Sequence, residues 1–214
     1  MKIAILGSGS VAKTLAAGFV KHGHSVTLGT RSPAALQDFV AAHPGVAVAS
    51  VAEAAAFGET LVLAVKGGAA MAVLRAAGAD RLASKTIIDA TNPIADAPPV
   101  NGVLRYFTGP NESLLEQLQA EFPQARLVKA FNSVGAACMV DPQLPGGRPT
   151  MFIAGNDAAA RAEVTAVLDS FGWDVADMGQ AEAARAIEPL AMLWCIPGLL
   201  RNDWVHAFKL LPGA

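Results

Sequence analysis

The chain has 214 residues, of which 53% are hydrophobic, and a formal net charge of −2 at pH 7. This balance offers no basic surface for nucleic acid and no polybasic segment to anchor the chain on a membrane. Cys138 and Cys195 lie far apart with no C-x-x-C motif, so we predict neither a disulfide nor a metal site. No apolar run approaches a membrane span, and Met1 leads straight into an apolar strand pattern, so we expect a cytoplasmic protein without a cleaved signal.

The first 32 residues combine two apolar runs, a glycine-rich stretch and a helical pattern. Residues 3–6 are an apolar run of the length of a buried strand, and residues 7–12 read Gly-Ser-Gly-Ser-Val-Ala. Apolar residues then recur at helical spacing over 11–19, and a second apolar run follows at 26–28. Strand, glycine turn, helix and strand in this order are typical of the first unit of a Rossmann-type fold.

Each small residue of the glycine stretch has a physical role in such a unit. Gly7 permits the tight turn, Gly9 lets the backbone approach a pyrophosphate, and Ala12 lets the helix pack closely on the strand. The alternative is a glycine turn that serves packing only. We predict a pyrophosphate site at the helix N-terminus, formed by Gly7, Ser8, Gly9, Ser10 and Val11.

The end of the second strand indicates which dinucleotide is bound. An NAD site usually places a carboxylate there to hold the ribose hydroxyls, but this chain has none before Asp38. Arg31 would attract a 2′-phosphate instead, and the hydroxyls of Thr30 and Ser32 add donors. Arg31 could also be a solvated arginine before a helix that begins at Ser32-Pro33. We predict NADP as the cofactor.

The rest of the chain alternates between short apolar runs and helical patterns. Strands are expected at residues 46–48, 61–65, 86–90, 126–130, 150–155 and 173–175. Helices are expected at residues 33–42, 50–57, 69–77, 113–121, 157–170, 180–194 and 199–211, with a break at 196–198. This alternation predicts an α/β fold with a Rossmann-type, doubly wound and mostly parallel sheet. We expect residues 1–132 to form the NADP-binding domain and residues 133–214 a small C-terminal α/β extension that completes the substrate cleft and packs with it as one unit.

Ligands of open parallel sheets lie at the carboxyl ends of the strands, and several candidate residues follow such ends. Val65 and Lys66 close one strand, and Asn92 and Pro93 follow the next. Lys66 could equally be a solvated turn residue, and Asn92-Pro93 an ordinary turn. A loop at 94–112 is long enough to form a wall or lid. Together these segments offer three candidates for contact with the substrate, namely Phe107, Phe131 and Asn132.

Acid–base chemistry has no clear candidate in the sequence. The four histidines stand in no ligand spacing, and there is no nucleophile elbow and no Walker lysine. Asp89, Asp141, Asp177 and Glu188 are not paired by their spacing. We therefore predict no catalytic side chain, and the hard chemistry would belong to cofactors.

Six stretches, spread over almost the whole chain, match the motifs of one family in order. The glycine motif at 5–12 is common to many folds, whereas Lys-Ala-Phe-Asn at 129–132 and Arg-Ala-Ile-Glu-Pro-Leu at 185–190 are far more specific. The other stretches lie at 29–32, 91–93 and 152–157. On these residues the chain resembles the NADP oxidoreductases that depend on coenzyme F-420, an 8-hydroxy-5-deazaflavin.

The resemblance implies one sheet that carries NADP and a small C-terminal part that walls a cleft, where hydride passes directly between two stacked rings. It implies that Thr30, Arg31 and Ser32 hold the 2′-phosphate and that Asn92 and Pro93 lie by the nicotinamide. The second substrate would be coenzyme F-420 or a flavin. Two alternatives stay open: an NADPH-dependent reductase of a small carbonyl or imine, and a sensor that binds NADP(H) without turnover. Apolar residues near the end of the chain fit either a core or a homodimer interface: Trp194, Leu199, Leu200, Trp204 and Phe208.

Overall fold

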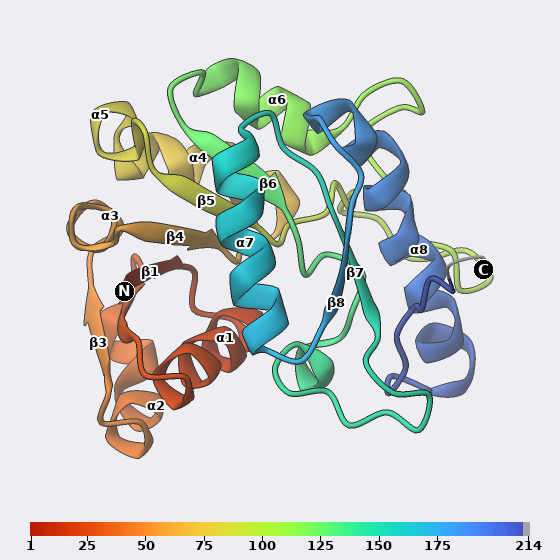
Figure 1. The fold of residues 1–214 in the computed structure, drawn as a ribbon, viewed down its shortest axis with the longest axis horizontal. Coiled ribbons are helices and arrows are strands. Elements are labelled where there is room, and N and C mark those ends of the chain that lie inside the picture. The colour runs from red at the N-terminus through yellow and green to blue at the C-terminus, as the bar shows by residue number, and fades with distance from the viewer. Residues whose placement is uncertain (212–214) are drawn as a thin grey trace.

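The computed structural model describes residues 1–211 and has one six-stranded parallel sheet at its centre. Its strands are β1 (Lys2–Leu6), β2 (Ser25–Gly29), β3 (Val46–Ala49), β4 (Thr60–Leu63), β5 (Thr86–Asp89) and β6 (Arg126–Lys129). The strand order is β3-β2-β1-β4-β5-β6, and the register places Ile5 between Leu28 and Val62. The Rossmann-type fold is confirmed, and all carboxyl ends meet at one edge of the sheet (Figure 1).

Helices cover both faces of the sheet. They are α1 (Ser10–Lys21), α2 (Gln37–Ala42), α3 (Val51–Phe57), α4 (Gly67–Ala77), α5 (Ala79–Leu82), α6 (Leu114–Glu121), α7 (Ala158–Ser170) and α8 (Ala184–Arg201), with short 3-10 turns at Pro33–Leu36, Ala136–Cys138 and Ala181–Ala183. A capping box opens α3 at Ser50, as expected, and another opens α6 at Ser113. The expected helix at 33–42 begins instead as a 3-10 turn, and α5 was not expected.

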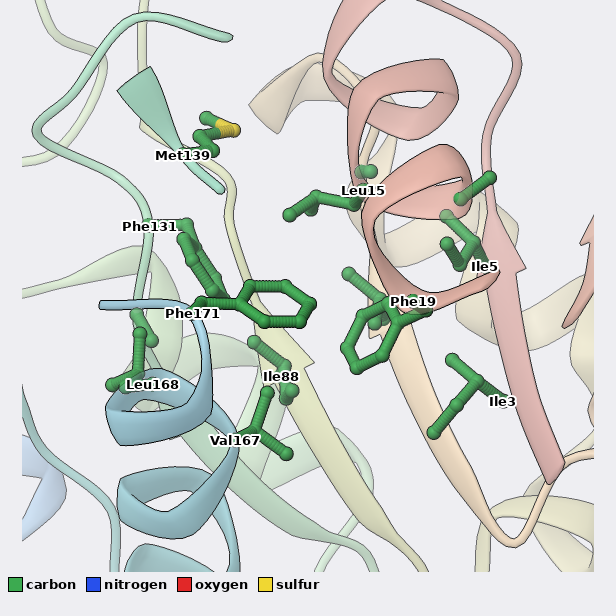
Figure 2. Packing of buried hydrophobic residues seen from close by; sticks show 14 of the residues in the cluster. Ile3, Ile5, Leu15, Phe19, Ile88, Phe131, Met139, Val167, Leu168 and Phe171 are labelled. Atoms are coloured by element: carbon green, nitrogen blue, oxygen red, sulfur yellow. The ribbon is translucent and has the colours of Figure 1, made fainter. Parts of the chain in front are cut away.

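Two apolar clusters hold these layers together. Alternate strand residues point to opposite faces, so Ile3 and Ile5 belong to one cluster with apolar residues of α1 and α7, whereas Ala4 and Leu6 belong to another with apolar residues of α3 and α4. Figure 2 shows Phe19 of α1 beside Phe171, which follows α7, and their ring centroids are 4.9 Å apart. The first cluster thus joins residues from both ends of the chain.

The C-terminal part carries a second, two-stranded parallel sheet of β7 (Thr150–Ile153) and β8 (Asp174–Asp177). The N–H of Lys129 donates to the carbonyl of Ala154 at 2.8 Å, which links β6 to the end of β7. The final segment returns to this sheet, because the N–H of Thr150 donates to the carbonyl of Phe208 at 2.8 Å. The small C-terminal α/β extension is therefore confirmed.

The end of the chain differs from the expected pair of helices. Helix α8 runs without a break through Pro189 and Pro197 and ends at Arg201, where the C-cap Asn202 has a left-handed φ of 55°. The indole of Trp204 fills the space beside Gly198, so residues after Asn202 fold back on α8 instead of continuing it. The expected helix at 199–211 was wrong beyond Arg201, because this tertiary packing outweighs the helical spacing of its apolar residues.

Helix α8 bears on the expectation that no apolar run in the chain approaches the length of a membrane span. Residues Ala181–Arg201 are long and apolar enough to cross a membrane by length and composition, a test that the core helices of soluble proteins also pass. In this fold 33% of the apolar window is buried, and α8 packs on the rest of the chain through Ile187, Ala191 and Trp194.

Candidate functional site

A cavity of about 560 Å³ lies at the carboxyl ends of β1, β2 and β4. It brings together the predicted glycine stretch, the end of the second strand and the Val65-Lys66 turn. The lining residues are Gly7, Ser8, Gly9, Ser10, Val11, Gly29, Thr30, Arg31, Val51, Ala64, Val65, Lys66, Ala69, Val73 and Ala90. We call this space the first cavity.

The backbone of the glycine stretch shapes one wall of the first cavity. Gly7 has φ +145°, and a Cβ atom there would lie 2.2 Å from the carbonyl oxygen of Ala64, so only glycine fits. Gly9 is the N-cap of α1 and has open space where a Cβ would lie. No side chain caps α1, which leaves the first N–H groups of this 12-residue helix for a ligand.

The charges around the first cavity favour an anion. Arg31 and Lys66 line it, and no carboxylate does. Both side chains are exposed, and neither forms an ion pair within residues 1–211. The hydroxyl of the buried Thr30 accepts a hydrogen bond from the Ser32 N–H at 3.1 Å, which shapes the turn that carries Arg31. The residues present therefore fit the phosphates of a dinucleotide.

A second cavity, of about 570 Å³, continues from the first. The two share Val65, Lys66, Ala69 and Ala90. The residues that line only the second are Gly67, Gly68, Asn92, Ile94, Ala95, Asp96 and Phe107. A Cβ atom on Gly67 would lie 1.9 Å from the carbonyl oxygen of Asn92, so glycine lets α4 begin against the 92–94 turn.

Four of the predicted site residues line neither cavity. Ser32 is exposed beside Arg31, and Pro93 is buried behind Asn92. Phe131 was expected in the cleft, but its ring lies in the core near Phe171, because φ at Phe131 is +61° and turns the chain back at that point (Figure 2). Asn132 is also buried, and it meets the site only through Asn92.

The structure adds a buried ion cluster that the spacing of the sequence did not show. Lys129, at the end of β6, is fully buried, and its Nζ lies 2.6 Å from Asp89 Oδ2 and 2.8 Å from Glu188 Oε1. Burial alone would lower the pKa of Lys129, but attraction to the two carboxylates outweighs this and raises the pKa above its ordinary value. A lysine inside the apolar run 127–130 was the one available signal, because a buried charge requires a partner.

A larger cavity, of about 690 Å³, lies at the other end of the sheet, beside the start of β6. Arg126 is the only cation in its lining, together with the carboxylates Glu116, Asp157 and Glu182. This cavity has neither the strand ends nor the charge that a dinucleotide requires.

Comparisons with known proteins relate this chain to NADP-dependent oxidoreductases. A sequence model of the family described as NADP oxidoreductase, coenzyme F420-dependent, matches residues 2–93. A crystal structure of a candidate F420-dependent NADP reductase from Arthrobacter sp. FB24 shares 38% identity and a TM-score of 0.93, and the match covers 99% of this chain and 100% of that one.

Two further relatives are more distant or longer. Metalloreductase STEAP3 from Rattus norvegicus is 31% identical over 209 residues, and the chain spans 39% of the length of that protein. A reductive aminase from Aspergillus terreus, solved with NADPH and ethyl-5-oxohexanoate, has a TM-score of 0.69 at 21% identity over 94% of this chain and 62% of that one, which shows the shared fold alone. On the full-length match at 38% identity and the glycine-stretch site, this chain belongs to the family of NADP oxidoreductases that depend on coenzyme F420.

Proposed function

We propose that the chain is an NADPH-dependent oxidoreductase that transfers a hydride between NADP(H) and a flavin-like ring such as the deazaflavin coenzyme F-420. The observation that carries the proposal is the pair of joined cavities. The first has two cations, no carboxylate and an uncapped helix N-terminus, and the second has small residues, an amide and Phe107. One cavity suits the phosphates of NADPH, and the next offers room for two rings.

Residues of the first cavity would hold NADPH, which supplies the hydride when it is bound. The uncapped N–H groups at the start of α1 would bind the pyrophosphate, and Arg31 would bind the 2′-phosphate. The Val65-Lys66 turn lines both cavities, so it would lie where the nucleotide passes from one to the other. These residues would bind and orient NADPH. The acceleration of hydride transfer would come from holding the two rings at near-contact distance.

The lining of the second cavity favours a ring acceptor over a carbonyl. Lys66 and Asp96 are its only titratable side chains, and both are exposed. Ring-to-ring hydride transfer needs no protein acid, because the reduced ring can take its proton from solvent. A carbonyl or imine requires a donor in the transition state. Reduction of a small imine is the second candidate, with Asp96 or Lys66 as the donor.

A panel of acceptors tests the proposal. NADPH oxidation is measured with coenzyme F-420, FMN, FAD, a ferric chelate and a cyclic imine, each with the wild type and with Asp96→Asn. We expect the highest kcat/KM for the deazaflavin or a flavin, unchanged in Asp96→Asn. Highest turnover of the imine would overturn the ring acceptor, and its loss in Asp96→Asn would assign Asp96 as the donor. Tight NADPH binding with no turnover of any acceptor would overturn the enzyme in favour of a sensor.

A further inference from the structure

The buried cluster of Asp89, Lys129 and Glu188 joins segments that are far apart in the chain. Lys129 Nζ lies within 2.6–2.8 Å of three oxygens: Asp89 Oδ2 at the end of β5, the Thr91 carbonyl in the turn that follows, and Glu188 Oε1 on α8. All three charged residues are at most 1% exposed. The cluster carries one net negative charge in the protein interior.

Stability alone does not account for such a cluster. Removing charges from water is costly, and well-packed apolar residues of similar volume are often at least as stabilising as a buried ion pair. What the charges add is a fixed orientation of the surrounding segments, because each carboxylate also accepts hydrogen bonds from backbone N–H groups. Asp89 Oδ1 accepts from the N–H of Thr91 at 2.9 Å and from its hydroxyl at 2.6 Å. Glu188 accepts from the N–H groups of Leu114 and Leu115 and so caps α6 from another helix.

Two asparagines, Asn92 and Asn132, are hydrogen-bonded to each other beside this cluster. Asn92, next to Thr91, donates from Nδ2 to the Asn132 carbonyl at 2.7 Å and accepts from Asn132 Nδ2 at 3.1 Å. Asn132 also donates to the carbonyl of Ile187, next to Glu188, at 3.0 Å. The pair requires the chain to reverse at Phe131, whose φ of +61° is unusual for an aromatic residue. Strain of this kind persists where surrounding contacts hold it.

We propose that Lys129 is a positioning residue: through Asp89, Glu188 and the Thr91 carbonyl it fixes Asn92 in the wall of the second cavity. Lys129 touches neither cavity, so it acts through its neighbours. Through Glu188 it is also connected to α8 and to the start of α6, which accounts for the wide separation of the segments that the cluster joins. The inference rests on the proposed function only for what the cavity binds, and the placement of Asn92 stands apart from it.

The test uses the double variant Lys129→Met/Glu188→Gln, which removes one cation and one anion and leaves the net charge of the cluster unchanged. The amide oxygen that Glu188→Gln introduces still accepts from one of the two N–H groups at the start of α6, which favours a folded protein. The control is Glu163→Gln. Glu163 of α7 accepts hydrogen bonds from Thr60 and Thr86, the first residues of β4 and β5. It therefore also connects a helix to the sheet, but at the amino ends of the strands, away from both cavities.

The first measurement is amide hydrogen exchange at Thr91 and Ile94 in the ligand-free protein, because their N–H groups donate to Asp89 Oδ1 and to the Asn92 carbonyl. We expect exchange about ten-fold faster in the double variant, because local opening is no longer held by the cluster, and no change in the control. The second is titration with NADP⁺ and with 2′-phospho-ADP-ribose, which lacks the nicotinamide. The affinity of the double variant for NADP⁺ should fall about ten-fold, the scale of one lost hydrogen bond, and its affinity for the fragment should stay unchanged.

Four results are informative. Unchanged exchange at these amides would overturn the inference, and so would equal losses for NADP⁺ and the fragment. If Glu163→Gln lost as much exchange protection and NADP⁺ affinity as the double variant, Lys129 would contribute only to overall stability, and the inference would be overturned as well. If the wild type bound neither NADP⁺ nor the fragment, the proposed function would fail, and the exchange measurement would still decide whether Lys129 positions Asn92.

Discussion

Arg31 is an exposed side chain without a carboxylate partner in the described part of the chain, so its charge is available to a ligand. Replacement by Ala should weaken NADPH binding by about 1.5–3 kcal/mol, the scale of a hydrogen bond to a charged group. NADH, which has no 2′-phosphate, should bind almost as before. Titration of both nucleotides checks this, with Arg201→Ala as a control on an exposed arginine at the end of α8. Equal losses for both nucleotides would contradict the assignment of NADP.

Gly7 and Gly9 give a matched pair in the same loop. Gly7→Ala should lower the free energy of unfolding by about 1–3 kcal/mol from backbone strain, and by more from the clash with Ala64. Gly9→Ala should leave stability nearly unchanged and weaken NADPH binding, because its methyl group enters open space beside the first cavity. Urea unfolding and nucleotide titration separate the two effects. A Gly7→Ala protein as stable as the wild type would refute the close approach.

The sequence predicted which single residues line the cavities where a motif gives each residue a chemical role. The glycine stretch, Thr30, Arg31, Val65 and Lys66 all line the first cavity. Asn92 and Phe107 line the second, but Phe131 and Asn132 do not, because the left-handed turn at Phe131 cannot be read from residue type. Pairing of Asp89, Lys129 and Glu188 required strand order and helix placement, which no local spacing contains.

Helix α6 shows how charge can make an element depend on pH. The pKa of Glu116 lies below its ordinary value, chiefly because of hydrogen bonds from Arg185, with further bonds from Ser113. A lowered pKa contributes stability that is present above the unfolded pKa and is lost as pH falls through the folded pKa. Gln can still close the capping box at Ser113, so the wild type should exceed Glu116→Gln in stability at pH 7 by about 0.2–1 kcal/mol, the scale of a part-exposed ion pair with Arg185. The difference should begin to shrink as pH falls below about 4.3, the ordinary glutamate pKa, and should vanish below the lower pKa of the folded state. Urea unfolding at several pH values checks this, and a constant difference would contradict it.

Elements with strong local signals were predicted best. The strands of the sheet and the capped helix after Ser50 lie within a few residues of their expected bounds. Errors gather at the end of the chain, where prolines suggest a break. There α8 continues through both prolines, because buried contacts of Ile187, Ala191 and Trp194 outweigh the missing N–H groups.

The whole molecule should unfold as one unit, because Phe19, Phe131 and Phe171 share a single apolar cluster. All three tryptophans, Trp173, Trp194 and Trp204, lie after residue 133. Their fluorescence therefore reports on the C-terminal part, whereas far-ultraviolet circular dichroism reports on all helices. We expect coincident urea transitions from the two probes. Separate midpoints would show that the two parts unfold independently.

Assembly stays a prediction. Trp194 is buried, but Leu199, Leu200, Trp204 and Val205 are exposed on α8 and the segment after it. We expect a homodimer in light scattering at tens of micromolar, a concentration at which a micromolar dimer persists. Leu200→Glu, at an exposed position, should then shift the protein toward monomer. A wild-type monomer under these conditions would contradict a stable dimer.

The buried cluster also constrains how this sequence can change over evolutionary time. Loss of Lys129 alone would leave two anions facing each other in the interior, at a cost of about 3–5 kcal/mol, a large part of the stability of an ordinary protein. Loss of Glu188 alone would leave the start of α6 without its acceptor. An apolar replacement is reached only through intermediates that fold poorly. We therefore expect Asp89, Lys129 and Glu188 to be inherited together among relatives, or exchanged together, although they lie in three distant parts of the chain.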